Sequence, residues 1–281
     1  MKRTATLWLI AAVLLIVIGL GIFASAMCGL KWDFTALSTE SYETNVYVIP
    51  KDFTNISIID TTADVTFISV ADGDASVTLR EESTAKHTVT VEDGTLRIEN
   101  TGEKAWYHHI GIHFDTPSIT IAIPQKQYGS LSVQITTGDI ALSDLNAEIL
   151  NLNTSTGSIR ISNTSCTGDA AIHVTTGRVC ASNLRLESLT STGNTGDVSL
   201  ENVLAASSIS IRRTTGDISL DRSDAGELHI QTNTGSVTGS LLSDKFFITK
   251  TTTGEIETPE SIPGGICRIE TTTGDIRITV E

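Results

Sequence analysis

The chain has 281 residues, a formal net charge of −14 at neutral pH and only 5 % aromatic residues. Nucleic acids and anionic membrane surfaces are bound through clustered lysine and arginine, so this charge argues against both kinds of partner. The apolar fraction of 40 % is sufficient for a core and too high for a disordered chain. Because aromatic residues are scarce, Ile, Leu and Val must form most of that core.

The amino terminus combines a short basic stretch with a long apolar segment. Lys2 and Arg3 precede residues 7–26, which are uncharged and long enough to cross a bilayer as a helix. Positive charge before such a segment predicts a cytoplasmic amino terminus and an extracytoplasmic remainder. We therefore expect residues 1–31 to form a cytoplasmic tip and a transmembrane signal anchor, which crosses the cell membrane once.

Two other processing routes are compatible with this segment. Ala24-Ser25-Ala26 has the small-x-small form of a signal-peptidase site, although the apolar run is longer than in most signal peptides. Cys28 follows the run as in a lipoprotein, but Met27 occupies the position where a small residue is expected. In every case residues 32–281 are exported with a net charge of −17, because the removed part holds three basic and no acidic residues.

The second half of the chain contains a repeat of 19 or 20 residues. Each of eight units has a glycine preceded by threonine; these are Thr137-Gly138, Thr156-Gly157, Thr176-Gly177, Thr195-Gly196, Thr215-Gly216, Thr234-Gly235, Thr253-Gly254 and Thr273-Gly274. Ile or Val stands two residues after each glycine, and alternate upstream positions are apolar in several units, which is typical of β-strands. A single coil of this kind cannot bury its apolar side, but stacked coils can. The sequence predicts an all-β protein in which residues 126–281 form a single-stranded parallel β-solenoid of about eight coils.

The apolar positions also predict how the chain turns in each unit. The threonine before the glycine shares the alternating track of the apolar residues upstream, whereas the Ile or Val after it lies three residues further on. Both can face one core only if the chain bends at the glycine, which tolerates a positive φ. We expect these threonines to form a hydrogen-bonded ladder inside the corner. The alternative is an outward Thr-x-Thr array, as in ice-binding solenoids, although only half of the units carry the triplet.

Residues 32–125 are also β-rich, but they are less regular. Thr62-Ala63-Asp64-Val65 resembles the repeat corner with alanine in place of glycine, and Glu92-Asp93-Gly94 is typical of a hairpin turn. An open first coil would expose strand edges, so we interpret residues 32–125 as an irregular β region that caps the solenoid. The last unit ends at Glu281 without a further cap, and we expect that edge to be open to another chain.

The segment 101–115 interrupts the strand pattern and is the main candidate for contact with a partner or the membrane. Its aromatic residues Trp106, Tyr107 and Phe114 are the partner-binding candidates, because exposed rings favour interfaces. The alternative is that these rings fold back on the cap. Its three histidines are weak candidates for a metal site, since no second ligand motif accompanies them: His108, His109 and His113.

The residues that directly follow the corner glycines, here called the acidic column, include the best candidate carboxylates for a metal site. Stacking places Asp197 beside Asp217 and Glu255 beside Asp275, and paired carboxylates bind calcium. The simpler interpretation is a solvated polar turn in which Arg178 pairs with Asp197. The chain has no recognisable catalytic motif, and its arginines are too scattered for a β-helix lyase or hydrolase. We therefore expect no catalytic residue, no bound metal and no cofactor.

The features above, taken together, resemble a known bacterial family. One membrane segment precedes an irregular β region with Glu92-Asp93-Gly94-Thr95-Leu96-Arg97-Ile98, then Ile123-Pro124 and repeated T-T-G-D-I units. This arrangement is similar to the bacterial "putative adhesin" domain family, which includes LiaG-like envelope proteins and is largely a domain of unknown function. The resemblance covers about residues 42–281. It implies an extracytoplasmic β-solenoid linked to envelope-stress regulation, with no catalytic residues to transfer.

The sequence favours a membrane-anchored, non-catalytic β-solenoid that serves as an adhesin-like binding or scaffolding module of the cell envelope. Besides the membrane, its candidate partners are a cell-wall glycan and another envelope protein. One alternative is an accessory protein that regulates a membrane-embedded envelope-stress sensor. The other is a polysaccharide-active β-helix enzyme.

Overall fold

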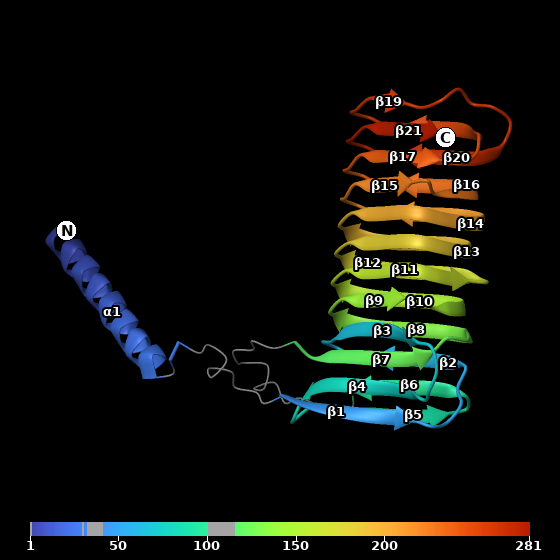
Figure 1. Cartoon of the computed structure of the whole chain (residues 1–281). Coiled ribbons are helices and arrows are strands. Elements are labelled where there is room, and N and C mark those ends of the chain that lie inside the picture. The colour runs from blue at the N-terminus through green and yellow to red at the C-terminus, as the bar shows by residue number, and fades with distance from the viewer. Residues whose placement is uncertain (1, 30, 33–41, 101–115) are drawn as a thin grey trace. The chain divides into compact units, whose positions relative to one another are not determined.

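The computed structural model describes residues 2–29, 31–32, 42–100 and 116–281, and Figure 1 shows their secondary structure. The amino-terminal unit contains one helix, α1 (Lys2–Gly29). Its part from Trp8 to Gly29 is apolar and long enough to cross a membrane, a property that anchors and signal sequences share. The second unit, which comprises the described residues from Tyr42 onwards, consists of β-strands.

The repeats form a parallel β-solenoid, as predicted, and each coil has one strand before the Thr-Gly corner and one after it. The pre-corner strands are β8 (Gln127–Thr137), β10 (Asn146–Thr156), β12 (Asp169–Thr176), β16 (Asp224–Gln231), β18 (Lys245–Lys250) and β20 (Gly265–Glu270). The post-corner strands are β9 (Ile140–Ser143), β11 (Ile159–Cys166), β15 (Ile218–Asp221), β17 (Val237–Leu241), β19 (Ile256–Glu257) and β21 (Ile276–Val280). Two longer strands, β13 (Val179–Thr195) and β14 (Val198–Arg212), run through a post-corner position and the following pre-corner position.

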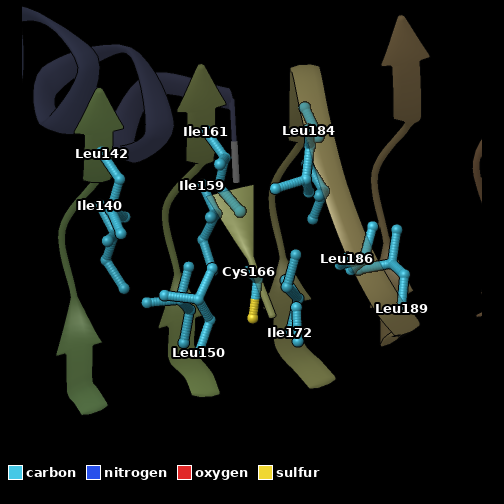
Figure 2. Packing of buried hydrophobic residues seen from close by; sticks show 14 of the residues in the cluster. Ile140, Leu142, Leu150, Ile159, Ile161, Cys166, Ile172, Leu184, Leu186 and Leu189 are labelled. Carbon is cyan, nitrogen blue, oxygen red and sulfur yellow. The ribbon is translucent and has the colours of Figure 1, made fainter. Parts of the chain in front are cut away.

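Equivalent positions of the repeat lie directly above one another. Ile159 pairs in parallel register with Ile140 in one neighbouring coil and with Val179 in the other, and all three are fully buried. Figure 2 shows such inward columns, with Ile140 and Leu142 of β9 next to Ile159 and Ile161 of β11. Burying each aliphatic side chain of this size stabilises the fold by about 1.5–3 kcal/mol, so the columns supply the core that few aromatic residues could.

The amino-terminal end of the solenoid combines two further coils with antiparallel strands. Its strands are β1 (Tyr42–Ile49), β2 (Asn55–Ile59), β3 (Asp64–Val70), β4 (Ala75–Glu82), β5 (His87–Glu92), β6 (Thr95–Asn100) and β7 (Ser118–Pro124). β2 and β3 lie between the coil of β8–β9 and the strands β6 and β7, all in parallel register. Beyond them β4 pairs with β7, β1 with β4 and β5 with β6, all antiparallel.

Two local signals in this region are confirmed by the structure. Thr62 bridges to Thr137, so Thr62-Ala63 occupies a Thr-Gly corner position with alanine in place of glycine. The predicted hairpin joins β5 to β6, and its turn residues Asp93 and Gly94 both have positive φ, at 48° and 70°. This is the conformation that a two-residue hairpin turn requires.

At the carboxyl-terminal end the coils do not stack in sequence order. β20 lies between β16 and β18, and β21 lies between β17 and β19. The prediction of an open edge at Glu281 is therefore wrong, because the last strand is internal and the coil of β18–β19 is outermost. Ile256 of β19 is accordingly 44 % exposed, although it occupies an inward position. Ser261 Oγ accepts a hydrogen bond of 3.1 Å from the amide of Phe247 and so covers part of the edge of β18.

Candidate functional site

The eight corner glycines hold the chain in a conformation that other residues rarely adopt. Their φ angles lie between 128° and 152°. At Gly177, in the middle of the solenoid, a Cβ atom would lie 1.8 Å from the carbonyl oxygen of Gly157 in the neighbouring coil. Glycine is therefore required at this corner both for the backbone conformation and for the close approach of adjacent coils.

The threonines before these glycines face solvent, which corrects the prediction of an interior ladder. All eight are exposed, because the chain leaves its alternating pattern two residues before the glycine rather than at it. The buried hydroxyls belong instead to threonines three residues before the glycine. Thr154 Oγ1 donates to the carbonyl oxygen of Gly138 at 3.1 Å, and Thr232 Oγ1 donates to that of Gly216 at 3.2 Å. The outward Thr-x-Thr array is wrong for the same reason, since the first threonine of the triplet points inward.

A pair of valine substitutions distinguishes the two threonine positions. Thr154→Val removes the hydroxyl that satisfies the Gly138 carbonyl, and we expect it to lower the free energy of unfolding by about 1 kcal/mol. Thr156→Val, in the same coil but exposed, should change it by less than about 0.5 kcal/mol. Urea denaturation of both variants measures the difference, and equal effects would contradict the assignment of the buried position.

Backbone amides of adjacent coils engage the carboxylates of the acidic column. Asp197 Oδ1 accepts from the amide of Asp217 at 3.1 Å, and Asp217 Oδ1 accepts from the amide of Ser236 at 2.8 Å. Arg178 Nε lies 3.5 Å from Asp197 Oδ2, and both side chains are largely exposed. These predicted neighbours are therefore adjacent in the structure, and each carboxylate already has a hydrogen-bonding role in the turn.

The second predicted pair has the same arrangement. Asp275 Oδ1 accepts from the amide of Glu255 at 2.9 Å, and Arg277 Nη2 lies 2.9 Å from Asp275 Oδ2. The hydrogen bond from the Glu255 amide, assisted by Arg277, lowers the pKa of Asp275. Across the part of the chain that the structure describes, no three His, Cys, Asp or Glu side chains converge on a metal-binding position.

The candidates in the segment 101–115 lie outside the described residues. They are Trp106, Tyr107, Phe114, His108, His109 and His113. Their roles in partner or metal binding stay predictions.

A shallow polar groove follows the outward face of the pre-corner strands, and its side chains come from the positions four and six residues before each glycine. One hollow of about 270 Å³ spans four coils; its polar lining residues are Ser132, Gln134, Asn151, Asn153, His173, Thr190 and Thr192. A second hollow of about 270 Å³ spans the next three coils; its polar lining residues are Ser210, Arg212, His229, Gln231, Arg268 and Glu270. Thr190 pairs with Ser210 and Thr192 with Arg212, so the two hollows lie on adjacent coils of the same face. We call this surface the polar groove, the first hollow its neutral half and the second its basic half.

The polar groove presents hydrogen-bonding groups at a regular spacing along the solenoid axis. Parallel strands lie about 4.8 Å apart, so seven coils extend over roughly 29 Å. His173 Nδ1 lies 2.9 Å from Thr192 Oγ1 in the next coil, a contact that orients the imidazole ring within the neutral half. Of the described residues that line the groove, Glu270 is the one carboxylate, and amides, hydroxyls, imidazoles and guanidinium groups make up the rest of the polar lining. The chemistry of this surface is that of a hydrogen-bonding platform.

The sequence analysis did not predict this groove because it considered mainly the apolar, inward positions of the repeat. The signal was present four residues before each glycine, where Gln134, Asn153, His173, Thr192 and Arg212 form a column of polar side chains.

A second missed column lies six residues after the glycine, on a turn whose residues have positive φ. There Asn183 Nδ2 donates to Asn163 Oδ1 at 2.9 Å, and Asn202 Nδ2 donates to Asn183 Oδ1 at 3.1 Å. Asparagine tolerates this conformation better than most residues, so the column indicates a structural ladder along a second edge of the solenoid.

A buried charged cluster joins three elements of the amino-terminal end. His87 Nδ1 lies 2.8 Å from Glu81 Oε2, and His87 Nε2 lies 2.8 Å from Asp60 Oδ2, with all three side chains at most 2 % exposed. Burial opposes the charged imidazolium, but the hydrogen bonds to the two carboxylates outweigh it and raise the pKa of His87. Because both ring nitrogens face carboxylates, the cluster binds the imidazolium and ties the β2–β3 corner to β4 and β5.

The corner repeat and the parallel coils define the class of protein as a glycine-cornered β-solenoid. The family model of the toastrack domain, DUF4097, matches residues 53–279, and the chain belongs to this family. The match includes strands β2 to β7 and all eight Thr-Gly corners.

Several solved structures are similar to this chain. A "putative adhesin" from Bacteroides fragilis is 16 % identical, with 85 % of this chain and 97 % of that chain covered and a TM-score of 0.42. A "putative adhesin" from Parabacteroides distasonis is 14 % identical, with 85 % and 98 % covered and a TM-score of 0.36. A "putative cell adhesion protein" from Clostridium sporogenes is 12 % identical, with 86 % and 100 % covered and a TM-score of 0.30. A comparison with curated proteins gives no match.

Proposed function

We propose that this protein is a non-catalytic, membrane-anchored binding module of the cell envelope that holds a linear, hydroxyl-rich cell-wall glycan along the polar groove. The observation that carries the proposal is the succession of two polar hollows along one face of seven adjacent coils, four in the neutral half and three in the basic half. Each coil presents the same side-chain positions at the same spacing, so one polymer can contact several coils at once.

The lining of the neutral half supports a glycan as the ligand. The amides of Gln134 and Asn153 and the hydroxyl of Thr192 donate and accept hydrogen bonds, as sugar hydroxyls do. The side chains stand on paired strands, so little backbone freedom is lost on binding. No aromatic side chain is present among the described lining residues of either half, so each subsite is weak. Affinity should therefore rise steeply with glycan length.

The amino-terminal helix supports a location at the envelope. We infer that residues 1–31 act as a single-pass signal anchor, with Lys2 and Arg3 on the cytoplasmic side and the solenoid outside. In this proposal residues 32–125 cap the solenoid and residues 126–281 carry the binding surface. The regulatory alternative depends on Trp106 and its neighbours, which the structure does not describe, so no described feature favours it.

The test is co-sedimentation of the full-length protein, in non-ionic detergent, with purified cell walls. Asn153→Ala combined with His173→Ala removes an amide and an imidazole from the neutral half, and we expect the dissociation constant to rise by about five-fold or more. The matched control, Thr156→Ala with Thr176→Ala, alters two exposed side chains of the same coils on the corner instead, and should bind like the wild type.

Calcium removal separates the groove from the acidic column. Because the column carboxylates already accept amide hydrogen bonds, we expect EDTA to leave wall binding unchanged. Loss of binding in EDTA, or in the corner variant but not the groove variant, would contradict the proposed surface. Absence of saturable binding to any wall preparation would refute the proposed function itself.

A further inference from the structure

We propose that the basic half of the polar groove is an anion-binding subsite, so that the glycan held by this protein carries carboxylate or phosphate groups. This inference rests on the proposed function and names the class of its ligand. It starts from a difference between the two halves, since Arg212 and Arg268 line the basic half whereas the neutral half has no charged side chain apart from the titratable His173.

Strand register places the basic side chains on three adjacent coils, with Arg212 and Arg268 on the two sides of the coil that carries His229 and Gln231. His229 pairs with Ser210 on one side and with Arg268 on the other, while Gln231 pairs with Arg212. These side chains therefore form a grid two positions wide on three successive coils. Such a grid offers guanidinium, imidazole, amide and hydroxyl donors to successive oxyanions of one polymer and to the sugar hydroxyls between them.

The two carboxylates near this grid contact Arg268 and His229 and leave Arg212 unpaired among the described residues. Glu270 Oε1 lies 3.5 Å from Arg268 Nη1, and Glu227 Oε2 lies 3.4 Å from His229 Nε2. Arg212 forms no ion pair with any residue that the structure describes, and its side chain is exposed. The guanidinium of Arg212 is thus available to an external anion.

A buried arginine adds to the positive potential beneath the groove. Arg213 is 2 % exposed, its Nη1 donates to the carbonyl of Arg212 at 3.1 Å, and its Nη2 donates to Ser191 Oγ at 3.0 Å. Its Nε has no hydrogen-bond partner, and no carboxylate in the described part of the chain forms an ion pair with it. Burial lowers the pKa of Arg213 only to about 10, so it stays charged at neutral pH.

The sequence of the neighbouring coil accommodates this arginine. Ser191 and Gly193 occupy inward positions that, apart from Arg213 itself, are apolar or threonine in the other coils. A Cβ atom on Gly193 would lie 3.0 Å from Arg213 Nη1. A buried charge without a counter-ion is costly, and in a low-dielectric core its field is poorly screened. We infer that Arg212 and Arg268 contact anionic groups of the polymer, while Arg213 adds positive potential beneath the boundary between the two halves.

The overall negative charge of the protein implies that any attraction of an anionic polymer comes from a local site. The exported part has a net charge of −17, so a polyanion is repelled by the molecule as a whole. Any preference for an anionic polymer must then come from a local subsite, and the basic half of the polar groove supplies one.

The experiment measures binding of full-length protein, in non-ionic detergent, to three soluble polymers by isothermal titration calorimetry. Polygalacturonate supplies carboxylates, poly(glycerol phosphate) supplies phosphates, and dextran is the neutral reference. We expect at least one anionic polymer to bind about ten-fold or more tightly than dextran. Which polymer binds tightly identifies the anion.

The variant pair isolates the subsite from general charge effects. Arg212→Gln with Arg268→Gln should abolish the preference for the anionic polymer while dextran binding persists. The matched control, Arg160→Gln with Arg178→Gln, makes the same change in net charge at exposed arginines outside the groove and should retain the preference.

Three outcomes would overturn the inference. The wild type would bind anionic polymers no better than dextran, the groove variant would keep the preference, or the control pair would lose it equally. Failure of the wild type to bind walls or any polymer would instead refute the proposed function. Binding of walls and dextran without an anionic preference would refute the subsite alone.

Discussion

Gly177→Ala is expected to lower the free energy of unfolding by about 3–5 kcal/mol, the sum of a strained backbone and an overlap between coils. The φ of Gly177 is 145°, and the added methyl group would lie 1.8 Å from the Gly157 carbonyl oxygen. The coils cannot separate locally without breaking the parallel hydrogen bonds on both sides of the corner. Urea denaturation followed by circular dichroism measures the loss.

Gly73→Ala is the matched control for this prediction. Gly73 also has positive φ, at 114°, but no atom lies within 4 Å of the position its Cβ would take. In the control the free energy of unfolding should fall only by the cost of the backbone conformation, about 1–2 kcal/mol. Equal losses in the two variants would show that the close approach of coils at the corner contributes nothing, against our interpretation of the repeat.

His87→Gln is expected to lower the free energy of unfolding by about 3 kcal/mol at pH 5.5, because it leaves Asp60 and Glu81 buried without their shared cation. The pKa of His87 is raised in the folded protein, because its hydrogen bonds to these carboxylates outweigh the opposing effect of burial. Its contribution to stability is therefore complete below the unfolded value of about 6.5 and is lost as the pH rises through the folded value.

The partner carboxylate has the opposite dependence. Burial raises the pKa of Asp60, but the bonds from His87 and from the amides of Thr61 and Thr62 lower it below 3.8 overall. Its contribution is present above pH 3.8 and is lost as the pH falls through the folded value. The cluster should thus stabilise the protein most between about pH 4 and 6.5.

Urea midpoints measured from pH 4 to pH 9 test this profile. The gap between wild type and His87→Gln should narrow as the pH rises towards 9. The exposed His173→Gln serves as the control and should follow the wild-type profile. A constant gap for His87→Gln across this range would contradict the assignment of an imidazolium to the cluster.

The solenoid was predictable because inward positions are constrained in every coil. Ile140, Ile159 and Val179 stack on one another, and each can be replaced only by a residue that fills the same space. Residues at a fixed distance from the glycine in successive repeats therefore indicate directly whether that position is buried. The apolar helix was predictable for a similar reason, since length and hydropathy alone define it.

The alternation of inward and outward residues along the strands did not predict which threonines of the corner are buried. The alternating pattern predicts one bend, at the glycine. The chain instead turns over several residues, and the two residues before the glycine face outward. The buried Thr154 and the exposed Thr156 are the same residue type, so the sequence does not distinguish them. The hydrogen bond from Thr154 to Gly138 requires knowledge of the neighbouring coil.

The order of the last coils was hidden because the repeat spacing is the same whichever coil stacks on which. Gly254 and Gly274 have the same surroundings in sequence, yet the coil of Gly274 is internal and that of Gly254 is outermost. The polar groove was hidden for a different reason. Its residues share a position in the repeat rather than a residue type. They can be recognised as one surface only when the structure shows that these positions face outward on adjacent coils.

The most direct test of the account is a tryptophan placed in the polar groove and another placed on the corner of the same coil. Thr192→Trp puts a bulky ring where the neutral and basic halves meet, and Thr195→Trp puts the same ring on the exposed corner three residues later. Both full-length variants are compared with the wild type for saturable binding to purified cell walls. We predict that Thr192→Trp abolishes binding and Thr195→Trp preserves it. Full binding by Thr192→Trp would contradict the claim that this groove is the functional surface.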